Sequence, residues 1–291
     1  MDYGSMMREI REIEGVLSGL LVQRVGRSLL GREIPCLSFG RGRRTVLYVG
    51  AHHGMEHLTA GVLLKFIREL LTAGKGTVAG VSAAYLLETR RYLVLLMLNP
   101  DGVSLAAQGL SSAGILSERL LRMNGGSRDF TKWQANARGV DLNHNYDAGF
   151  WEYKTLEGSL GIEGGCPTRY AGEYPASEPE TAALTALIDL VSPELILTLH
   201  TQGGEIYYTA GEYALPRSAS VARAMARHAG YRAGIPEGAA AYGGLTDYAV
   251  SRLGIPSYTV ECGRGENPLP SDALQAVYRE VRPLLWLAPV L

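Results

Sequence analysis

Three of the six histidines in this chain, His52, His53 and His57, lie close together and surround Glu56. His53 and Glu56 are three residues apart, so on a turn that enters a helix their side chains point to the same side and can bind one metal ion. A His-x-x-Glu pair alone is a weak signal, because a glutamate near a helix N-terminus is also favoured by the helix dipole. A metal site therefore requires further ligands elsewhere in the chain.

Such residues follow two later apolar segments. His200 follows residues 195–199 in the same way that His53 follows the β-branched segment 45–51. In open α/β sheets, ligand sites form at the carboxyl ends of the strands. Glu261 ends another apolar segment, where a buried carboxylate is costly unless a metal ion or a partner lies nearby. Two histidines and a glutamate as ligands, with a second glutamate as base, form the composition of a catalytic zinc site.

The elements that must position these residues are short apolar strands alternating with amphipathic helices. Nearly all-apolar strands are typical of a sheet that is covered on both faces. We therefore predict an α/β fold: a single domain over residues 1–291 with a mixed, mostly parallel, twisted sheet and helices on both faces, preceded by an N-terminal helical extension over residues 1–29. The strands are expected at 45–51, 92–98, 195–199 and 257–261, and the helices around residues 10–17, 62–71, from 177 to before Pro193, 217–228, 245–253 and 272–285.

Composition narrows the range of partners and compartments. The 291 residues are 46% hydrophobic and 20% charged, which is typical of a globular protein. The net charge is −1 and the longest basic stretch is the short segment 41–44, which argues against a nucleic-acid or membrane partner. Three scattered cysteines do not suggest a disulfide framework, and the N-terminus lacks the apolar core of a signal peptide, so we expect a cytoplasmic location.

Several motifs in one order resemble the zinc carboxypeptidases, the carboxypeptidase A-like metallopeptidases. They are His53-x-x-Glu56, the GVDLN segment 139–143, the histidine of TLHTQ at 200, the GGLTDY stretch from 243 and the glutamate of TVE at 261. The resemblance implies a zinc peptidase that hydrolyses an amide bond by metal-activated water. It further implies one zinc ion per chain bound by His53, Glu56 and His200, with Glu261 as general base and Asp141 holding His53 in place.

The chain departs from that family where a substrate C-terminus would be held. The family's asparagine–arginine pair, which clamps a terminal carboxylate, stands here as Asn143 and His144. An always-charged fork is thus replaced by a ring that is largely neutral at pH 7. We expect Asn143 and His144 to contact the substrate, with binding through His144 strengthening as its ring becomes protonated.

Further family side chains are missing near the expected catalytic centre. Gln134 stands where the family has an arginine that stabilises the oxyanion, and Arg138 is the candidate to replace it. The family's mobile tyrosine aligns with Ala239, although nearby Tyr242 is a candidate for its role. Loss of the carboxylate contacts with retention of the catalytic set predicts a substrate other than an ordinary protein C-terminus.

The sequence around the predicted site residues resembles one bacterial branch of the family. The stretches WQANARGVDLN, HTQGGEIYY and ECGRGENPLP are similar to peptidases that cleave γ-D-glutamyl-diaminopimelate bonds in peptidoglycan peptides. The resemblance implies a small cell-wall peptide as substrate, with Gln134, Gln202, Tyr242 and Arg264 as candidate contacts. The alternatives are a zinc carboxypeptidase or N-acyl amino acid deacylase on the same fold, or a non-catalytic peptide-binding descendant. The presence of Glu261 argues against the last, since a binding module needs no base.

Overall fold

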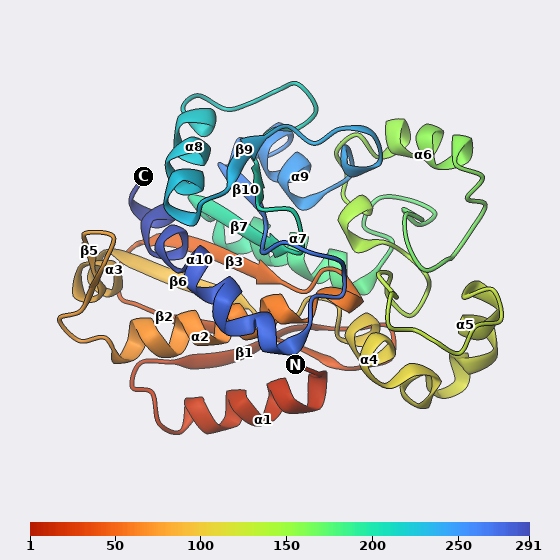
Figure 1. Cartoon of the computed structure of the whole chain (residues 1–291), viewed down its shortest axis with the longest axis horizontal. Coiled ribbons are helices and arrows are strands. Elements are labelled where there is room, and N and C mark those ends of the chain that lie inside the picture. The colour runs from red at the N-terminus through yellow and green to blue at the C-terminus, as the bar shows by residue number, and fades with distance from the viewer.

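A mixed eight-stranded sheet runs through the computed structural model, which describes all 291 residues (Figure 1). The strand order is β1-β2-β6-β3-β7-β10-β8-β9. The four central strands β6, β3, β7 and β10 are mutually parallel, whereas β1, β2 and β8 join antiparallel to their inner neighbours. The predicted α/β fold with a mostly parallel sheet in one domain is confirmed. The strands are β1 Leu21–Arg27, β2 Glu33–Phe39, β3 Arg44–Gly50, β6 Arg90–Leu95, β7 Leu195–His200, β8 Glu205–Tyr207, β9 Arg232–Gly234 and β10 Ser257–Glu261.

The alternation of side chains along each strand divides the core between two helical layers. Val46 and Tyr48 of β3 pack into the larger cluster, which the helices α1, α2, α8 and α10 cover. Leu47 and Val49 point the other way and pack with α7 and α9. Helices on both faces explain why the central strands are apolar throughout. The main helices are α1 Tyr3–Glu14, α2 Leu58–Thr72, α3 Ala83–Thr89, α4 Pro100–Gln108, α5 Ser117–Met123, α6 Phe150–Ser159, α7 Pro179–Val191, α8 Ser218–Ala229, α9 Leu245–Ser251 and α10 Leu274–Leu287.

The predicted helical extension over residues 1–29 is wrong in its second half. Within residues 1–29 only α1 is helical. The later strand β1 is an antiparallel edge strand that pairs with β2 and packs against α7. β1 lies at the edge of the sheet and carries exposed polar and charged side chains, so it lacks the apolar run that marks a central strand. β2 lies between β1 and β6 and is largely buried, but Glu33, Pro35 and Ser38 interrupt its apolar residues. A short two-stranded sheet, β4 Thr77–Val78 and β5 Val81–Ser82, lies apart from the main sheet. None of the helices has the length and apolar composition needed to cross a membrane.

The order and register of the central strands bring the predicted site residues to one edge of the sheet. Gly50, at the end of β3, pairs with Leu199, the residue before His200. His200, the last residue of β7, pairs with Glu261, the last residue of β10. Three chain segments that are far apart in sequence therefore end side by side, as expected for the carboxyl edge of a parallel sheet.

Candidate active site

Two imidazoles and one carboxylate converge just beyond this sheet edge. His53 Nδ1 lies 3.0 Å from Glu56 Oε1, His200 Nδ1 lies 3.1 Å from Glu56 Oε2, and the two Nδ1 atoms are 3.2 Å apart. The three side chains are buried, and one ligand atom from each lies within 4.8 Å of the others. Two histidine nitrogens and a carboxylate oxygen form a donor set that suits zinc and leaves a coordination position for water or substrate. The predicted ligands His53, Glu56 and His200 are thus brought together.

The turn that carries His53 and Glu56 is fixed by close backbone packing. Residues Gly54–Glu56 form one 3₁₀ turn between β3 and α2. A Cβ atom on Gly54 would lie 2.4 Å from the carbonyl oxygen of Gly102, so only glycine fits against the start of α4. The Gly54 N–H also donates to the carbonyl of Gln134 at 2.9 Å. The ligand turn is therefore held between α4 and the loop that precedes Asp141.

Asp141 fixes the orientation of the ligand His53 from the side of the ring that faces away from Glu56. His53 Nε2 donates to Asp141 Oδ1 at 3.1 Å, which leaves Nδ1 as the nitrogen that can bind a metal ion. Asp141 also accepts from the backbone N–H groups of Asn143 and Arg169, both at 3.1 Å. Although burial opposes ionisation, the imidazole of His53 holds the pKa of Asp141 below its usual range. A fully buried carboxylate with these donors is the partner that a metal-bound histidine requires.

The electrostatics of the ligand triad favour a cation. Against the effect of burial, His53 and His200 hold the pKa of Glu56 at about 2, so this carboxylate is ionised across the physiological range. Burial lowers the pKa of His200 and keeps its ring neutral. Although burial also opposes a charge on His53, the carboxylates of Glu56 and Asp141 raise its pKa well above the usual range. The charged ring of His53 lies between these two carboxylates. A metal ion that binds its Nδ1 therefore displaces a proton from this ring.

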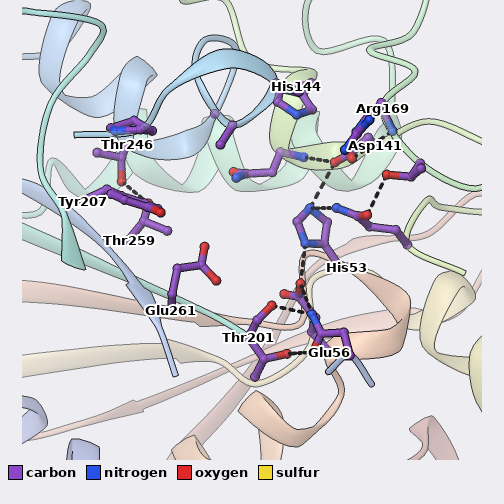
Figure 2. A pocket seen from close by; sticks show the side chains of 18 of the residues that line it. His53, Glu56, Asp141, His144, Arg169, Thr201, Tyr207, Thr246, Thr259 and Glu261 are labelled. Atoms are coloured by element: carbon purple, nitrogen blue, oxygen red, sulfur yellow. Dashed lines mark hydrogen bonds and ion pairs between the residues drawn. The ribbon is translucent and has the colours of Figure 1, made fainter. Parts of the chain in front are cut away.

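Glu261 faces the triad from the end of β10. Its carboxylate makes no hydrogen bond or ion pair within the protein and points into the open space beside His53 and Glu56 (Figure 2). Burial, and then the negative charges of Glu56 and Glu205, raise the pKa of Glu261 to about 8. A free carboxyl with a pKa near neutral is suited to take a proton and return it.

The triad and Glu261 line a cavity of about 470 Å³. Its apolar lining residues are Met55, Pro236, Ala239 and Ala240, and the rest of the wall is polar. Beside His53 and Asp141 the wall carries Gln134, which contacts His53, Thr168, which donates to Gln134, and Arg169, which donates to Asp141 from its backbone. Figure 2 shows Tyr207, Thr246 and Thr259 across the cavity from Arg169, and Thr209 and Asp247, their near neighbours in sequence, also line the cavity. A cavity of this size holds a small peptide or amino acid derivative.

Asn143 and His144, both predicted substrate contacts, line the cavity. Asn143 Oδ1 accepts from the Leu245 N–H at 3.2 Å, which leaves its amide NH₂ without a partner in the protein. His144 Nδ1 donates to the Tyr242 carbonyl at 2.8 Å, and its ring stacks on Tyr153 with centroids 3.7 Å apart. The neutral ring of His144 thus has no second N–H for a substrate carboxylate, so the expected contact requires the protonated ring.

Gln134, the other residue compared with a family arginine, also lies in the cavity. Its amide nitrogen lies 3.1 Å from His53 Nε2, and its Oε1 accepts from the Thr168 hydroxyl at 2.6 Å. Gln134 therefore packs beside the ligand histidine and brings no positive charge to the site.

Four predicted site residues lie outside the cavity. Arg138 donates from Nε to the buried carboxylate of Glu178 at 3.1 Å, which engages its guanidinium away from the cavity. Arg264 donates to the Gly230 carbonyl at 2.6 Å and stacks on Tyr231. The remaining two, Gln202 and the exposed Tyr242, are likewise absent from the cavity wall. This placement does not support catalytic or substrate-binding roles for the four residues.

Arg169 is the arginine that does line the cavity, although it was not among the predicted site residues. It lies in the irregular segment between α6 and α7, with a left-handed φ of 68°. Its backbone is held by the hydrogen bond to Asp141 and by the Tyr153 hydroxyl, which donates to its carbonyl at 3.2 Å. Because tertiary contacts of this kind set the conformation, no local motif could have identified the residue.

Comparison with known proteins finds a family and relatives to which this chain is similar. Residues 8–283 match the peptidase M14 family, described as zinc carboxypeptidase. The chain is 31% identical over 281 residues to γ-D-glutamyl-L-diamino acid endopeptidase 1 of Lysinibacillus sphaericus, covering 96% of this chain and 69% of that protein. It is 29% identical over 180 residues to murein peptide amidase A of Escherichia coli K12, covering 60% of this chain and 57% of that protein.

Solved structures share the fold at lower sequence identity. Carboxypeptidase A from Helicoverpa armigera superposes with a TM-score of 0.74 at 19% identity, covering 99% of this chain and 73% of that one. The murein-tripeptide amidase from Escherichia coli O157 superposes with a TM-score of 0.57 at 22% identity, covering 95% of both chains.

Proposed function

The chain belongs to the zinc carboxypeptidase family and is a zinc-dependent peptidase, and from this premise we propose that it cleaves the amide bond between a γ-D-glutamyl residue and diaminopimelate in peptidoglycan peptides. The similarity to the Lysinibacillus endopeptidase over nearly the whole chain supports this substrate. The composition of the cavity supports it independently.

The observation that carries the proposal is the polar wall opposite Arg169. Thr246 donates or accepts hydrogen bonds with Ser257 and Thr259 at 3.0 and 2.8 Å, which forms a row of hydroxyl groups. Asp247 Oδ1 and Thr209 Oγ1 are buried at this end of the cavity and have no hydrogen-bond partner. Buried polar groups without partners are costly, so this wall suits a substrate that brings hydrogen-bond donors. A side chain that ends in an ammonium and a carboxylate, as in diaminopimelate, meets that need better than an apolar one.

The chain's own residues can perform amide hydrolysis from these positions. His53, Glu56 and His200 would hold the metal ion, and bound zinc supplies a Lewis acid that polarises the carbonyl and lowers the pKa of a water molecule. Glu261 accepts a proton from the attacking water and donates it to the leaving nitrogen, since its carboxylate faces the ligand triad and has no other partner in the protein. Asp141 keeps His53 in the tautomer that presents Nδ1 to the metal, and the free amide of Asn143 is placed to hold a substrate oxygen.

A panel of substrates tests this proposal. The zinc-loaded protein is incubated with cell-wall tripeptides and tetrapeptides, with ordinary peptides that end in a free carboxylate, and with N-acyl amino acids, and the products are identified by mass. We expect cleavage between the glutamyl and diamino acid residues only. Release of C-terminal residues from ordinary peptides would instead indicate a carboxypeptidase, and release of acyl groups a deacylase. Absence of any cleavage would favour a peptide-binding role.

A cytoplasmic location forms part of the same proposal. Cys36, Cys166 and Cys262 are all unpaired, and free thiols are the rule in a reducing compartment. Fractionation of cells that express the protein from its own gene, followed by immunodetection, measures this directly. Recovery outside the cytoplasm would contradict this part of the proposal.

A further inference from the structure

The end of the cavity beyond His53 carries a cation without a partner. Two cationic side chains line the cavity, Lys132 and Arg169. Lys132 forms an ion pair with Glu266 at 2.7 Å. No carboxylate lies within ion-pair distance of the Arg169 guanidinium, and it makes no hydrogen bond within the protein. Its five N–H donors are therefore available to a ligand.

The backbone of Arg169 is fixed relative to the metal centre. Its N–H donates to Asp141 Oδ2, and Asp141 Oδ1 accepts from the ligand His53. Figure 2 shows Arg169 beside Asp141, on the far side of the His53 ring from Glu261. Two hydrogen bonds, both accepted by Asp141, therefore connect the backbone of Arg169 to the metal ligand His53. A guanidinium in this position can reach a group on the substrate that lies near the scissile bond without itself touching the reacting atoms.

The two ends of the cavity differ in charge, and the two halves of the proposed substrate differ in the same sense. The end with Thr246, Asp247 and Thr259 has hydroxyl groups and a carboxylate but no cation. It suits the diamino acid residue, which carries an ammonium, whereas the amine of the glutamyl residue is acylated. The D-glutamyl residue, which is joined through its γ-carboxyl, retains a free α-carboxylate and no free amine. An unpaired arginine is the complement of that residue.

We propose that Arg169 is a specificity-determining residue that binds the free α-carboxylate of the γ-linked glutamyl residue, on the acyl side of the scissile amide. The inference rests on the proposed function and adds to it the orientation of the substrate. The acyl half lies toward Arg169, Gln134 and Thr168, and the leaving diamino acid lies toward Thr246 and Thr259. An enzyme with this contact distinguishes a γ-glutamyl peptide from one whose α-carboxyl is amidated.

The test compares two substrates that differ in one group. One is L-Ala-γ-D-Glu-diaminopimelate, and the other carries an α-carboxamide on the glutamyl residue. We expect wild type to cleave the carboxylate form with a kcat/KM about 10- to 100-fold higher, the range expected for a charge-assisted contact. Arg169→Gln should lower kcat/KM for the carboxylate form to that of the amide form and change the amide form little. Arg169→Lys should restore part of the preference.

Controls separate this role from a structural one. Arg138→Gln removes an arginine that lies outside the cavity and should keep the wild-type preference. Zinc content and melting temperature of Arg169→Gln should match wild type, because the hydrogen bond to Asp141 comes from the backbone. Equal cleavage of both substrates by wild type, or an equal loss on both in Arg169→Gln, would overturn the role of Arg169 alone. If wild type cleaves neither γ-linked peptide but cleaves other members of the substrate panel, the proposed function itself fails and this inference with it.

Discussion

Two sets of buried carboxylates lie on either side of the loop over residues 134–141, and their surroundings differ. In the metal centre, imidazoles face Glu56 and Asp141, and both pKa values are held low despite burial. In the second set, which we call the anchor network, the carboxylates face amides, hydroxyl groups and arginines. The anchor network consists of Asp101, Glu178 and Glu180 with Ser28, Arg32, Asn136 and Arg138.

The anchor network ties the turn between β1 and β2 to the loop that presents Asp141. Asp101 accepts from the Ser28 hydroxyl at 2.8 Å and from Arg32 at 2.6 Å. Asn136 donates to Glu178 at 2.7 Å and to Glu180 at 3.2 Å. Burial, with Asp101 as a nearby negative charge, raises the pKa of Glu180 to about 7. The comparison shows that burial alone does not make a cation site: the pKa of the buried Glu180, which faces no imidazole, is raised, whereas the imidazoles beside Glu56 and Asp141 keep both of these carboxylates charged.

The largest effect is expected from a variant that removes the metal centre and leaves the anchor network intact. His53→Ala combined with His200→Ala should reduce zinc from about one ion per chain to none and abolish hydrolysis, because one carboxylate cannot hold the ion alone. Elemental analysis of the purified variant measures this, with circular dichroism to confirm the fold. Glu180→Gln, the matched change in the anchor network, should retain zinc. Unchanged zinc content in the double variant would refute the ligand assignment.

The next effect separates chemistry from metal binding within the same centre. Glu261→Gln should lower kcat by at least about 100-fold, the usual loss for a positioned acid–base group, while zinc content stays at the wild-type level. Single-turnover kinetics on the zinc-loaded variant check it. Activity comparable to wild type would assign the base elsewhere, and Glu205 is the next carboxylate to test, although it is paired with Arg232 and Tyr207.

A smaller effect is expected in the way the stability of the folded protein depends on pH. The pKa of Glu180 rises from 4.5 in the unfolded chain to about 7 in the folded protein, so the folded protein binds this proton more tightly. Stability is therefore fully present below about pH 4.5 and falls as the pH rises toward 7, by about 3 kcal/mol in total. Glu180→Gln should remove this fall.

Urea unfolding of wild type and Glu180→Gln at about pH 5, 6.5 and 8 measures the difference in slope. The contribution of the metal centre is common to both proteins and cancels in the difference. Parallel curves would show that Glu180 is already ionised in the folded protein at low pH.

The metal centre and the anchor network also show how much of the structure could be predicted from the sequence. The central strands and the ligands were predictable because each ligand directly follows an apolar segment, and parallel strands must bring their ends together. Strands β1 and β2 were not predicted, since β1 is an edge strand with exposed polar side chains and Glu33, Pro35 and Ser38 interrupt the apolar residues of β2. The short strands β8 and β9 span three residues each and left too little pattern to detect.

The cavity wall was less predictable than the metal ligands because loops build much of it. Arg138 and Arg169 lie on two segments that are both irregular, and nothing in their local sequence shows which will reach the cavity. Tertiary contacts decide it, because Glu178 of the anchor network binds Arg138 while Asp141 of the metal centre fixes the backbone of Arg169. Thr246 and Thr259 become one row of hydroxyl groups only when α9 packs on β10.

The smallest expected effect concerns His144, which lies in the cavity but is held as a structural residue. Its Nδ1–H is donated to the Tyr242 carbonyl, and its ring is stacked within 9° of the plane of Tyr153. Burial lowers the pKa of His144, although the charge of Asp141 opposes this, so the ring is neutral at pH 7 and presents an unprotonated Nε2 to the cavity. A neutral acceptor cannot replace an arginine as a carboxylate clamp, and its substitution should cost little binding.

We therefore expect His144→Gln to keep kcat/KM within about twofold of wild type and to show the same pH profile between about pH 6 and 8. The glutamine amide can still donate a hydrogen bond to the Tyr242 carbonyl, so the variant conserves the contact that the structure shows. Steady-state kinetics on the γ-glutamyl substrate measure both quantities. If KM of wild type alone decreases as the pH falls through the titration of the ring, protonated His144 binds the substrate carboxylate after all. Substrate binding would then depend both on Arg169 and on a pH-dependent charge at His144.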